Sequence, residues 1–413
     1  MHVGLILAHY RKKSGITQED LGEGICSVTH ISKIERGITE VSNDTVQILG
    51  QRLCININEE IEKLNKYKSD LDTILLHLEY QNYNEANSLL DSINFENFRY
   101  IDEIYVYYLL IKARYLIVIN ELSKAKKMLQ QKIVVSNLDN QHMKDMYIHV
   151  NALLDLKLAN YASALDKMLK LKLNPPYSKE VYYHLSYAAY FSNQFLLSFQ
   201  YALKAKTYFQ SNNNFVKVID CESLILLNIE EDQEFTFEII EKKYLELIKL
   251  IDQLKLDHKK STIYHNLGYQ YFKNGKFLEA INYYNKSLEL DTAANLNPLT
   301  SYYGLARCTI ESGLFEYSYS EELIKKGIKL SKKWKDEKYN LYFKILNLKN
   351  TKNYMKYYAV IEENLVTLFN SCPINDFRKN FLFPLINYII ENNQSDRLFN
   401  LILNYKHLIN KEL

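Results

Sequence analysis

Apolar residues recur with a helical period along almost the whole chain. In the first fifty residues they form short runs three and four residues apart, such as Ile31 with Ile34. A residue that caps helices well precedes three of these runs, namely Thr17, Ser27 and Ser42. Because a helix of about seven residues is not stable alone, these segments must pack on one another.

Glycine and proline divide the chain into two parts. Six of the 11 glycines lie within the first 50 residues, none lies between Gly50 and Gly268, and all five prolines follow residue 174. The first part therefore has the tight turns of a small helical domain, and the rest has long helices joined by polar corners. So few turn-forming residues leave little room for a β-sandwich or barrel, and we expect an all-α protein.

Composition and charge name no partner for the chain as a whole. Hydrophobic residues make up 47%, charged residues 24%, and the net charge is +2. The five cysteines are widely spaced and form no CxxC pair, so we expect free thiols and a cytoplasmic location. The chain has no run of eighteen apolar residues and no basic start typical of a secretory signal, which argues against a membrane protein.

Three motifs at fixed offsets mark the first segment. They are Val3-Gly4-x-x-Leu7-x-x-Tyr10-Arg11, then Gly15-Ile16-Thr17-Gln18-Glu19-Asp20-Leu21, then Ile31-Ser32-Lys33-Ile34-Glu35-Arg36-Gly37. This pattern resembles the helix-turn-helix domain of lambda-type repressors, a domain of four or five helices. The resemblance implies that the helix over residues 27–36 lies in the major groove of DNA. It also implies a buried ion pair between Arg11 and Glu35.

The DNA-facing residues follow from that placement. We expect Ser27, Val28, Thr29, Ser32 and Lys33 at the base edges or the helix start, and Gln18 and His30 at phosphates. Through residue 55 the chain carries six basic and six acidic residues. A monomer should therefore bind DNA weakly, and two copies on a two-fold operator are needed. The alternative is a helix-turn-helix used only for protein contacts.

A repeat is clearest over residues 261–291. It reads Tyr264-x-x-Leu267-Gly268-x-x-Tyr271, then Gly275-x-Phe277, then Ala280-x-x-x-Tyr284-x-x-Ser287. These offsets resemble a tetratricopeptide repeat, in which the small residue at Gly268 allows two helices to approach closely. Fainter copies precede and follow it. The resemblance implies a right-handed superhelical array over residues 67–413, after a helix-turn-helix domain over 1–56 and a linker helix over 57–66.

Such an array has a concave wall to which the first helix of each pair contributes. The inward positions are Arg114, His149, Tyr183, Tyr187, His265, Asn266, Tyr269, Tyr303 and Arg307. Aromatic faces, amides and cations suit an extended peptide, whose backbone needs hydrogen-bond partners and whose terminal carboxylate needs a cation. Asn266 is the leading candidate, because its side chain both donates and accepts. The alternative for each residue is a solvent-facing position without a ligand.

Motifs for catalysis and cofactor binding are missing. The sequence contains no GxxxxGK[ST], GxGxxG, GxSxG or HExxH. His142 and His149 are seven residues apart, but no carboxylate or cysteine at ligand spacing accompanies them. We therefore expect no catalytic residues, no metal and no cofactor.

A repressor-type domain followed by tetratricopeptide repeats resembles the RNPP superfamily of peptide-sensing regulators, and the layout is most similar to its NprR branch. The resemblance implies a cytoplasmic homodimeric transcription factor that binds operator DNA and a short signalling peptide. Related repeat proteins sequester or dephosphorylate response regulators, so a response-regulator partner at residues 59–92 is the first alternative. A phage or plasmid repressor built from the same parts is the second.

Overall fold

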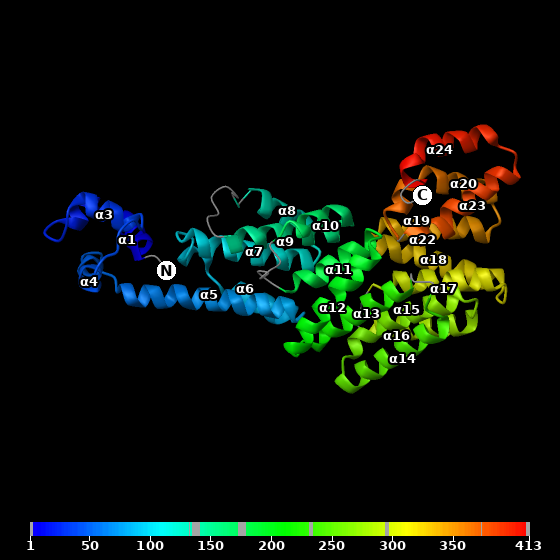
Figure 1. The fold of residues 1–413 in the computed structure, drawn as a ribbon, viewed down its shortest axis with the longest axis horizontal. Coiled ribbons are helices and arrows are strands. Elements are labelled where there is room, and N and C mark those ends of the chain that lie inside the picture. Colours follow the sequence, from blue (N-terminus) through cyan, green and yellow to red (C-terminus); the bar gives the residue numbers. More distant parts are fainter. Residues whose placement is uncertain are drawn as a thin grey trace. The chain divides into compact units, whose positions relative to one another are not determined.

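The structure is a computed structural model that describes residues 3–131, 133, 141–171, 179–230, 234–293, 297–372 and 374–409, and every regular element in these ranges is helical (Figure 1). The helices group into two units by their contacts. Unit 1 comprises residues 1–158 and 170–177, and unit 2 comprises residues 159–169 and 178–413. The expected all-α class is confirmed.

Unit 1 begins with four short helices. They are α1 Val3–Lys13, α2 Gln18–Gly22, α3 Val28–Glu35 and α4 Asn43–Arg52. Thr17, a predicted cap, forms a capping box with Asp20 at the start of α2, and the Ser27 and Ser42 side chains accept backbone N–H groups at the starts of α3 and α4. The inward residues are Leu7, Leu21, Ile31, Ile34, Val46, Leu49 and Leu53, all of which are buried. Apolar spacing and caps therefore predicted the starts of α2, α3 and α4 and the buried pair Ile31 and Ile34.

The linker helix is longer than predicted. α5 runs without a break over Ile57–Glu79, so the linker over residues 57–66 and the start of the repeat domain are one helix. The Tyr10 hydroxyl donates to Glu60 of α5 at 2.7 Å, which ties α1 to this helix. The rest of unit 1 consists of α6 Tyr83–Ser92, η1 Phe95–Asn97, α7 Asp102–Val118, α8 Leu122–Gln131 and α9 Gln141–Lys157.

Unit 2 consists of a succession of helices. The first are α10 Tyr161–Leu169, α11 Val181–Phe191, α12 Phe195–Ser211, α13 Phe215–Glu230, α14 Phe237–Leu254 and η3 Asp257–Lys259. They are followed by α15 Lys260–Lys273, α16 Phe277–Ala293, α17 Leu299–Ser312, α18 Tyr317–Lys333, α19 Glu337–Asn350 and α20 Tyr354–Glu363. The last are α21 Leu365–Phe369, α22 Ile374–Phe377, the π-helix η4 Arg378–Leu382, α23 Phe383–Glu391 and α24 Ser395–Ile409.

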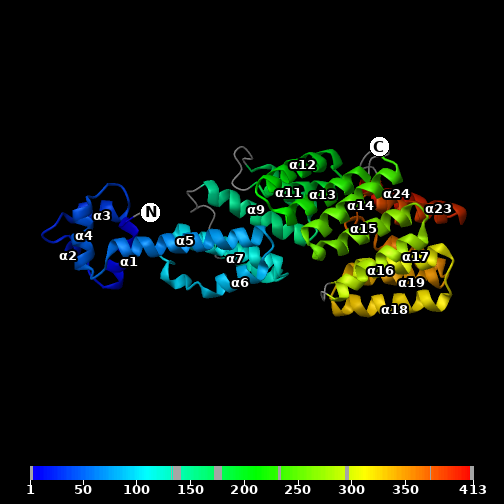
Figure 2. The ribbon, with the colours of Figure 1, turned by 90° about the horizontal axis from the view of Figure 1, so that it is seen from below.

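Consecutive helices of unit 2 pack side by side, and alternate helices also contact each other. α15 packs on α16 and on α17, and α17 packs on α18 and on α19 (Figure 2). Among the odd-numbered helices, α11 contacts α13, α15 contacts α17, and α17 contacts α19. Repeat packing of this kind buries each pair's apolar face against its neighbours.

The corners between helices explain how the array forms with so little glycine. Most corners contain one residue with a left-handed backbone conformation. This residue is glycine at Gly275 and Gly313, but asparagine at Asn120 and Asn193 and lysine at Lys335. Asparagine tolerates this conformation better than most residues with a side chain, so the polar corners expected from the sequence end the helices as glycine does elsewhere.

Candidate functional sites

The outer face of α3 carries the residues expected at DNA. Val28, Thr29 and Lys33 are exposed, whereas His30 and Ser32 are half-buried. Ser27 lies at the helix start, where its hydroxyl accepts the His30 N–H at 3.3 Å. Helical geometry separates these side chains from the buried face of α3, which packs into the domain core. The helix therefore presents a short polar surface with one cationic residue.

The predicted ion pair joins α1 to α3. Arg11 Nε lies 2.6 Å from Glu35 Oε1 and its Nη2 lies 3.1 Å from Oε2, while Nη1 donates to the Ile16 carbonyl at 2.9 Å. The Glu35 carboxylate raises the pKa of Arg11. Gln18, expected at a phosphate, donates its amide N–H to the same carboxylate at 2.8 Å. A phosphate contact by Gln18 stays a prediction, and in this structure the amide supports the ion pair.

Arg52 stabilises the turn of the motif, which sequence reasoning missed. Its Nη1 donates to the carbonyl oxygens of Asp20, Leu21 and Glu23 at 3.1, 3.0 and 2.6 Å. These carbonyls lie at the C-terminal end of α2, where backbone acceptors lack partners within the helix. A basic residue in the last turn of α4 was the only signal available in the sequence.

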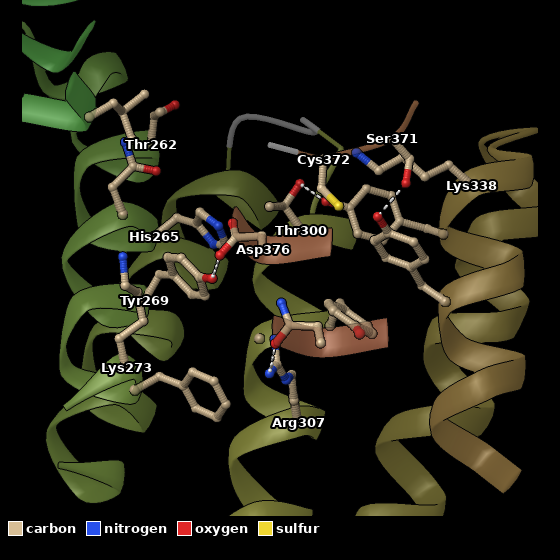
Figure 3. A pocket seen from close by; sticks show the side chains of 18 of the residues that line it. Thr262, His265, Tyr269, Lys273, Thr300, Arg307, Lys338, Ser371, Cys372 and Asp376 are labelled. Carbon is tan, nitrogen blue, oxygen red and sulfur yellow. Dashed lines mark hydrogen bonds between the residues drawn. The ribbon is translucent and has the colours of Figure 1, made fainter. Parts of the chain in front are cut away.

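A cavity of about 480 Å³ opens in unit 2 among the first helices of the repeats (Figure 3). Its wall comes from α11, α13, α15, α17 and α19, together with residues of α22 and η4. Six of the nine predicted groove residues line it: Tyr187, His265, Asn266, Tyr269, Tyr303 and Arg307. The repeat offsets thus predicted which face of several helices points inward, and six residues chosen on that face line one cavity.

The other three predicted groove residues do not line this cavity. Tyr183 lies on α11 beneath Lys217, whose ammonium is 4.6 Å from the centre of the tyrosine ring. Arg114 on α7 and His149 on α9 belong to unit 1, where both side chains are buried. The repeats around them matched the pattern only faintly, so helical spacing did not separate a groove position from a core position.

Arg307 is already paired inside the protein. Its Nε donates to Glu311 at 3.0 Å, its Nη2 donates to Asn380 at 2.8 Å, and its guanidinium carbon lies 4.5 Å from the centre of the Phe272 ring. Burial by itself would raise the pKa of Glu311, but Arg307 and Lys349 outweigh it and lower that pKa. The charge of Arg307 is thus largely compensated before any ligand enters.

Two lysines of the cavity wall, Lys273 and Lys338, were missed by the sequence analysis. Lys273 lies 5.5 Å from the centre of the Tyr269 ring, and Lys338 lies 5.5 Å from that of Tyr339. Among the described residues, neither ammonium lies within ion-pair distance of a carboxylate. They are therefore the cations of the wall with charge left for an anionic group.

The polar groups of the wall are held in fixed arrangements. Burial lowers the pKa of His265 to about 4, so its imidazole is neutral, and its Nδ1 lies 3.1 Å from the Ser301 hydroxyl. The Ser301 hydroxyl lies 2.8 Å from the Ser287 hydroxyl, which in turn lies 3.1 Å from the Ser261 hydroxyl. Tyr269 donates its hydroxyl to Asp376 at 2.6 Å (Figure 3). A ligand would meet oriented donors and acceptors along an aromatic wall.

The described part of the chain was also compared with what a metal site, a disulfide or a membrane span requires. In the described ranges, no group of three or more His, Cys, Asp or Glu side chains is arranged to hold a metal ion. All five cysteines have free thiols. No helix within those ranges combines the length and apolar character that a bilayer crossing needs.

Comparison with known proteins finds a family match in each of the two parts of the chain. The helix-turn-helix family matches residues 7–55, and the tetratricopeptide repeat family matches residues 261–291. The transcriptional activator NprA of Geobacillus stearothermophilus is 27% identical over 288 residues, which are 65% of this chain and 67% of the relative. The chain is thus similar to a regulator of the type that the sequence motifs indicated.

Solved structures share the fold of this chain. The structure of a Rap protein complexed with competence and sporulation factor superimposes with a TM-score of 0.69 at 17% identity, over 84% of this chain and 97% of the other. NprR in complex with its cognate peptide NprX gives a TM-score of 0.64 at 23% identity, over 82% of this chain and 99% of the other. The fold that the resemblance implied, a helix-turn-helix domain followed by tetratricopeptide-like helical repeats, is therefore confirmed.

Proposed function

We propose that this protein is a peptide-sensing regulator of the RNPP type, a cytoplasmic, homodimeric transcription regulator that binds operator DNA through α3 and a short signalling peptide in the cavity of unit 2. One observation carries the proposal: a single chain combines an exposed polar face on a helix-turn-helix with a cavity walled by phenols, an amide, a neutral imidazole and unpaired ammonium groups. It acts as a regulator and not as an enzyme.

The cavity wall matches the chemistry of a peptide. An extended peptide presents carbonyl oxygens, N–H groups and a terminal carboxylate, each of which needs a partner when water is excluded. Asn266 offers both a donor and an acceptor, and Lys273 and Lys338 offer positive charge for a carboxylate. NprR has been solved with its cognate peptide and a Rap protein with its signalling factor, which agrees with a peptide in this repeat unit.

The balance of acidic and basic residues in the helix-turn-helix domain favours a dimer on DNA. Because acidic and basic residues balance through residue 55, phosphate neutralisation by one copy contributes little affinity. Two copies of α3 on half-sites about 34 Å apart double the contacts and fix the operator spacing. A peptide that binds one arrangement of the dimer better than another shifts the population between them, and DNA affinity follows.

Capture of genomic DNA fragments by the full-length protein tests the DNA-binding part. We expect a limited set of fragments to be retained, with a changed yield when a pool of short random peptides is added. Lys33→Ala should weaken retention, whereas Lys325→Ala, which removes one exposed positive charge from α18, should not. Equal retention by both variants, or no selected fragment with or without peptides, would contradict the proposal.

The Rap-like fold supports a second function, binding of a response regulator at residues 59–92 of α5 and α6. Pull-down of purified response regulators by this protein distinguishes this second function from DNA-binding regulation. Stable capture without DNA, abolished by changes on the exposed face of α5 and unaffected by Lys33→Ala, would favour this second function.

A further inference from the structure

A short segment near the C-terminus crosses to the wall of the cavity. It consists of α22 and the π-helix η4, Ile374–Leu382, which we call the crossing segment. The Ile374 N–H donates to Asn193 Oδ1 at 2.9 Å, across 181 residues of sequence. Asp376 accepts the Tyr269 hydroxyl at 2.6 Å across 107 residues, and Asn380 accepts from Arg307 at 2.8 Å across 73 residues. One segment of nine residues thus touches three different parts of unit 2.

The two sides of the crossing segment are attached differently. Its apolar side chains Phe377, Phe381 and Leu382 are buried in the cluster formed with the C-terminal helices. Its contacts with the cavity wall include hydrogen bonds from Tyr269 and Arg307 (Figure 3). Apolar burial is hard to replace, whereas a hydrogen bond is readily exchanged for an equivalent one. The polar side is therefore the side on which a ligand can compete.

The π-helix places the segment's second polar contact. A π-turn shifts the register of side chains relative to an α-helix, and such turns are frequent at functional sites. Here it follows α22 directly, with Asn380 on the Arg307 guanidinium and Phe381 in the cavity wall. The local geometry is thus arranged so that an acceptor meets the arginine that the sequence analysis assigned to peptide binding.

We propose that the crossing segment is an internal pseudo-ligand, which occupies the hydrogen-bonding groups of Tyr269 and Arg307 until an external peptide replaces it. The proposal rests on the proposed function, because it names the step by which the same cavity is regulated. A peptide need only supply two acceptors, and its backbone carbonyls or a carboxylate do so. Binding then frees Asp376 and Asn380 and loosens the link from α15 and α17 to the C-terminal helices.

Removing the segment's acceptors tests this competition. The variant Asp376→Ala/Asn380→Ala leaves Tyr269 and Arg307 intact. Its matched control is Asp396→Ala/Asn400→Ala, the same residue types at the same spacing on the exposed surface of α24. Full-length proteins are incubated with a pool of short random peptides, and the peptides retained are quantified by mass spectrometry. We expect at least tenfold more retention by the cavity variant than by wild type, with the control unchanged.

A second variant acts outside the cavity. Asn193→Gly keeps the left-handed corner and removes only the acceptor for the Ile374 N–H. We expect increased retention here as well, and faster hydrogen exchange in residues 374–382 in both variants without peptide. In wild type, the peptide pool should raise exchange in this segment.

The outcomes separate the pseudo-ligand from the proposed function. Equal peptide retention by wild type and the Asp376→Ala/Asn380→Ala variant overturns the pseudo-ligand and leaves peptide binding intact. Retention by none of the proteins overturns both. Peptide binding that leaves hydrogen exchange of residues 374–382 unchanged shows that ligand and segment are bound together, and this also overturns the competition.

Discussion

Gly304 should tolerate no side chain, because Tyr284 fills the space where one would lie. A Cβ at Gly304 of α17 would approach Tyr284 Cζ to 2.4 Å. The Tyr284 ring is only 1% exposed, and Gly268 of α15 packs on the ring as well, where a Cβ would come within 3.1 Å. The ring thus occupies the room left by two missing side chains, as the repeat motif predicted for Gly268.

The stability cost of Gly304→Ala follows from two opposed effects. Adding atoms to a close-packed core costs about 1–3 kcal/mol, and a contact at 2.4 Å lies at the upper end because ring and helices must both shift. Replacing glycine by alanine inside a helix contributes about 1 kcal/mol in the other direction. Gly304→Ala should therefore destabilise unit 2 by roughly 1–2 kcal/mol. Gly268→Ala, with its milder contact, should be close to neutral.

Hydrogen exchange of α15–α17 is the appropriate assay, because a chain with two units need not unfold in one step. The matched comparison is Gly304→Ala against Gly268→Ala. Combining each with Tyr284→Leu closes the double-mutant cycle, and Gly304→Ala should lose most of its cost once the ring is gone. Equal costs of Gly304→Ala with and without the ring, or a stabilised Gly304→Ala protein, would refute this account of the packing.

Three further changes probe the two sites. Arg11→Met leaves the Glu35 carboxylate largely buried without its cation, so the unfolding free energy of the helix-turn-helix domain should fall by about 2–4 kcal/mol. Urea unfolding followed by signals from α1–α4 measures this loss, and an unchanged midpoint would contradict the structural role of the ion pair. Thr17→Ala removes the capping box of α2 and should cost about 1 kcal/mol in the same assay, against a neutral Thr39→Ala control. Burial lowers the pKa of His265 from 6.5 to about 4, so between these pH values the unfolded chain binds a proton at this imidazole and the folded chain does not. The stability of unit 2 should therefore fall by up to about 3 kcal/mol as the pH drops from 6.5 to 4. His265→Gln should flatten this pH dependence when stability is measured by hydrogen exchange.

The local part of this protein was determined by its sequence. Short-range patterns predicted the helix starts at Thr17, Ser27 and Ser42, because each cap lies next to the helix that it begins. A motif with fixed offsets predicted the ion pair between Arg11 and Glu35 in the helix-turn-helix domain. Periodicity also selected the helix faces that carry six of the nine groove residues. Local hydrogen bonding and amphipathic spacing suffice for these features, because they do not depend on what lies across the fold.

Contacts between distant segments were decided by the tertiary structure alone. Periodicity placed Arg307 on the groove face but did not show that Glu311 and Asn380 already hold it, and it assigned Arg114 to the groove although that side chain is buried in unit 1. The crossing of Ile374–Leu382 to the cavity wall leaves no periodic trace. A helix face fixes the direction of a side chain, whereas its partner depends on which remote element packs there, and this emerges only when the whole unit has folded.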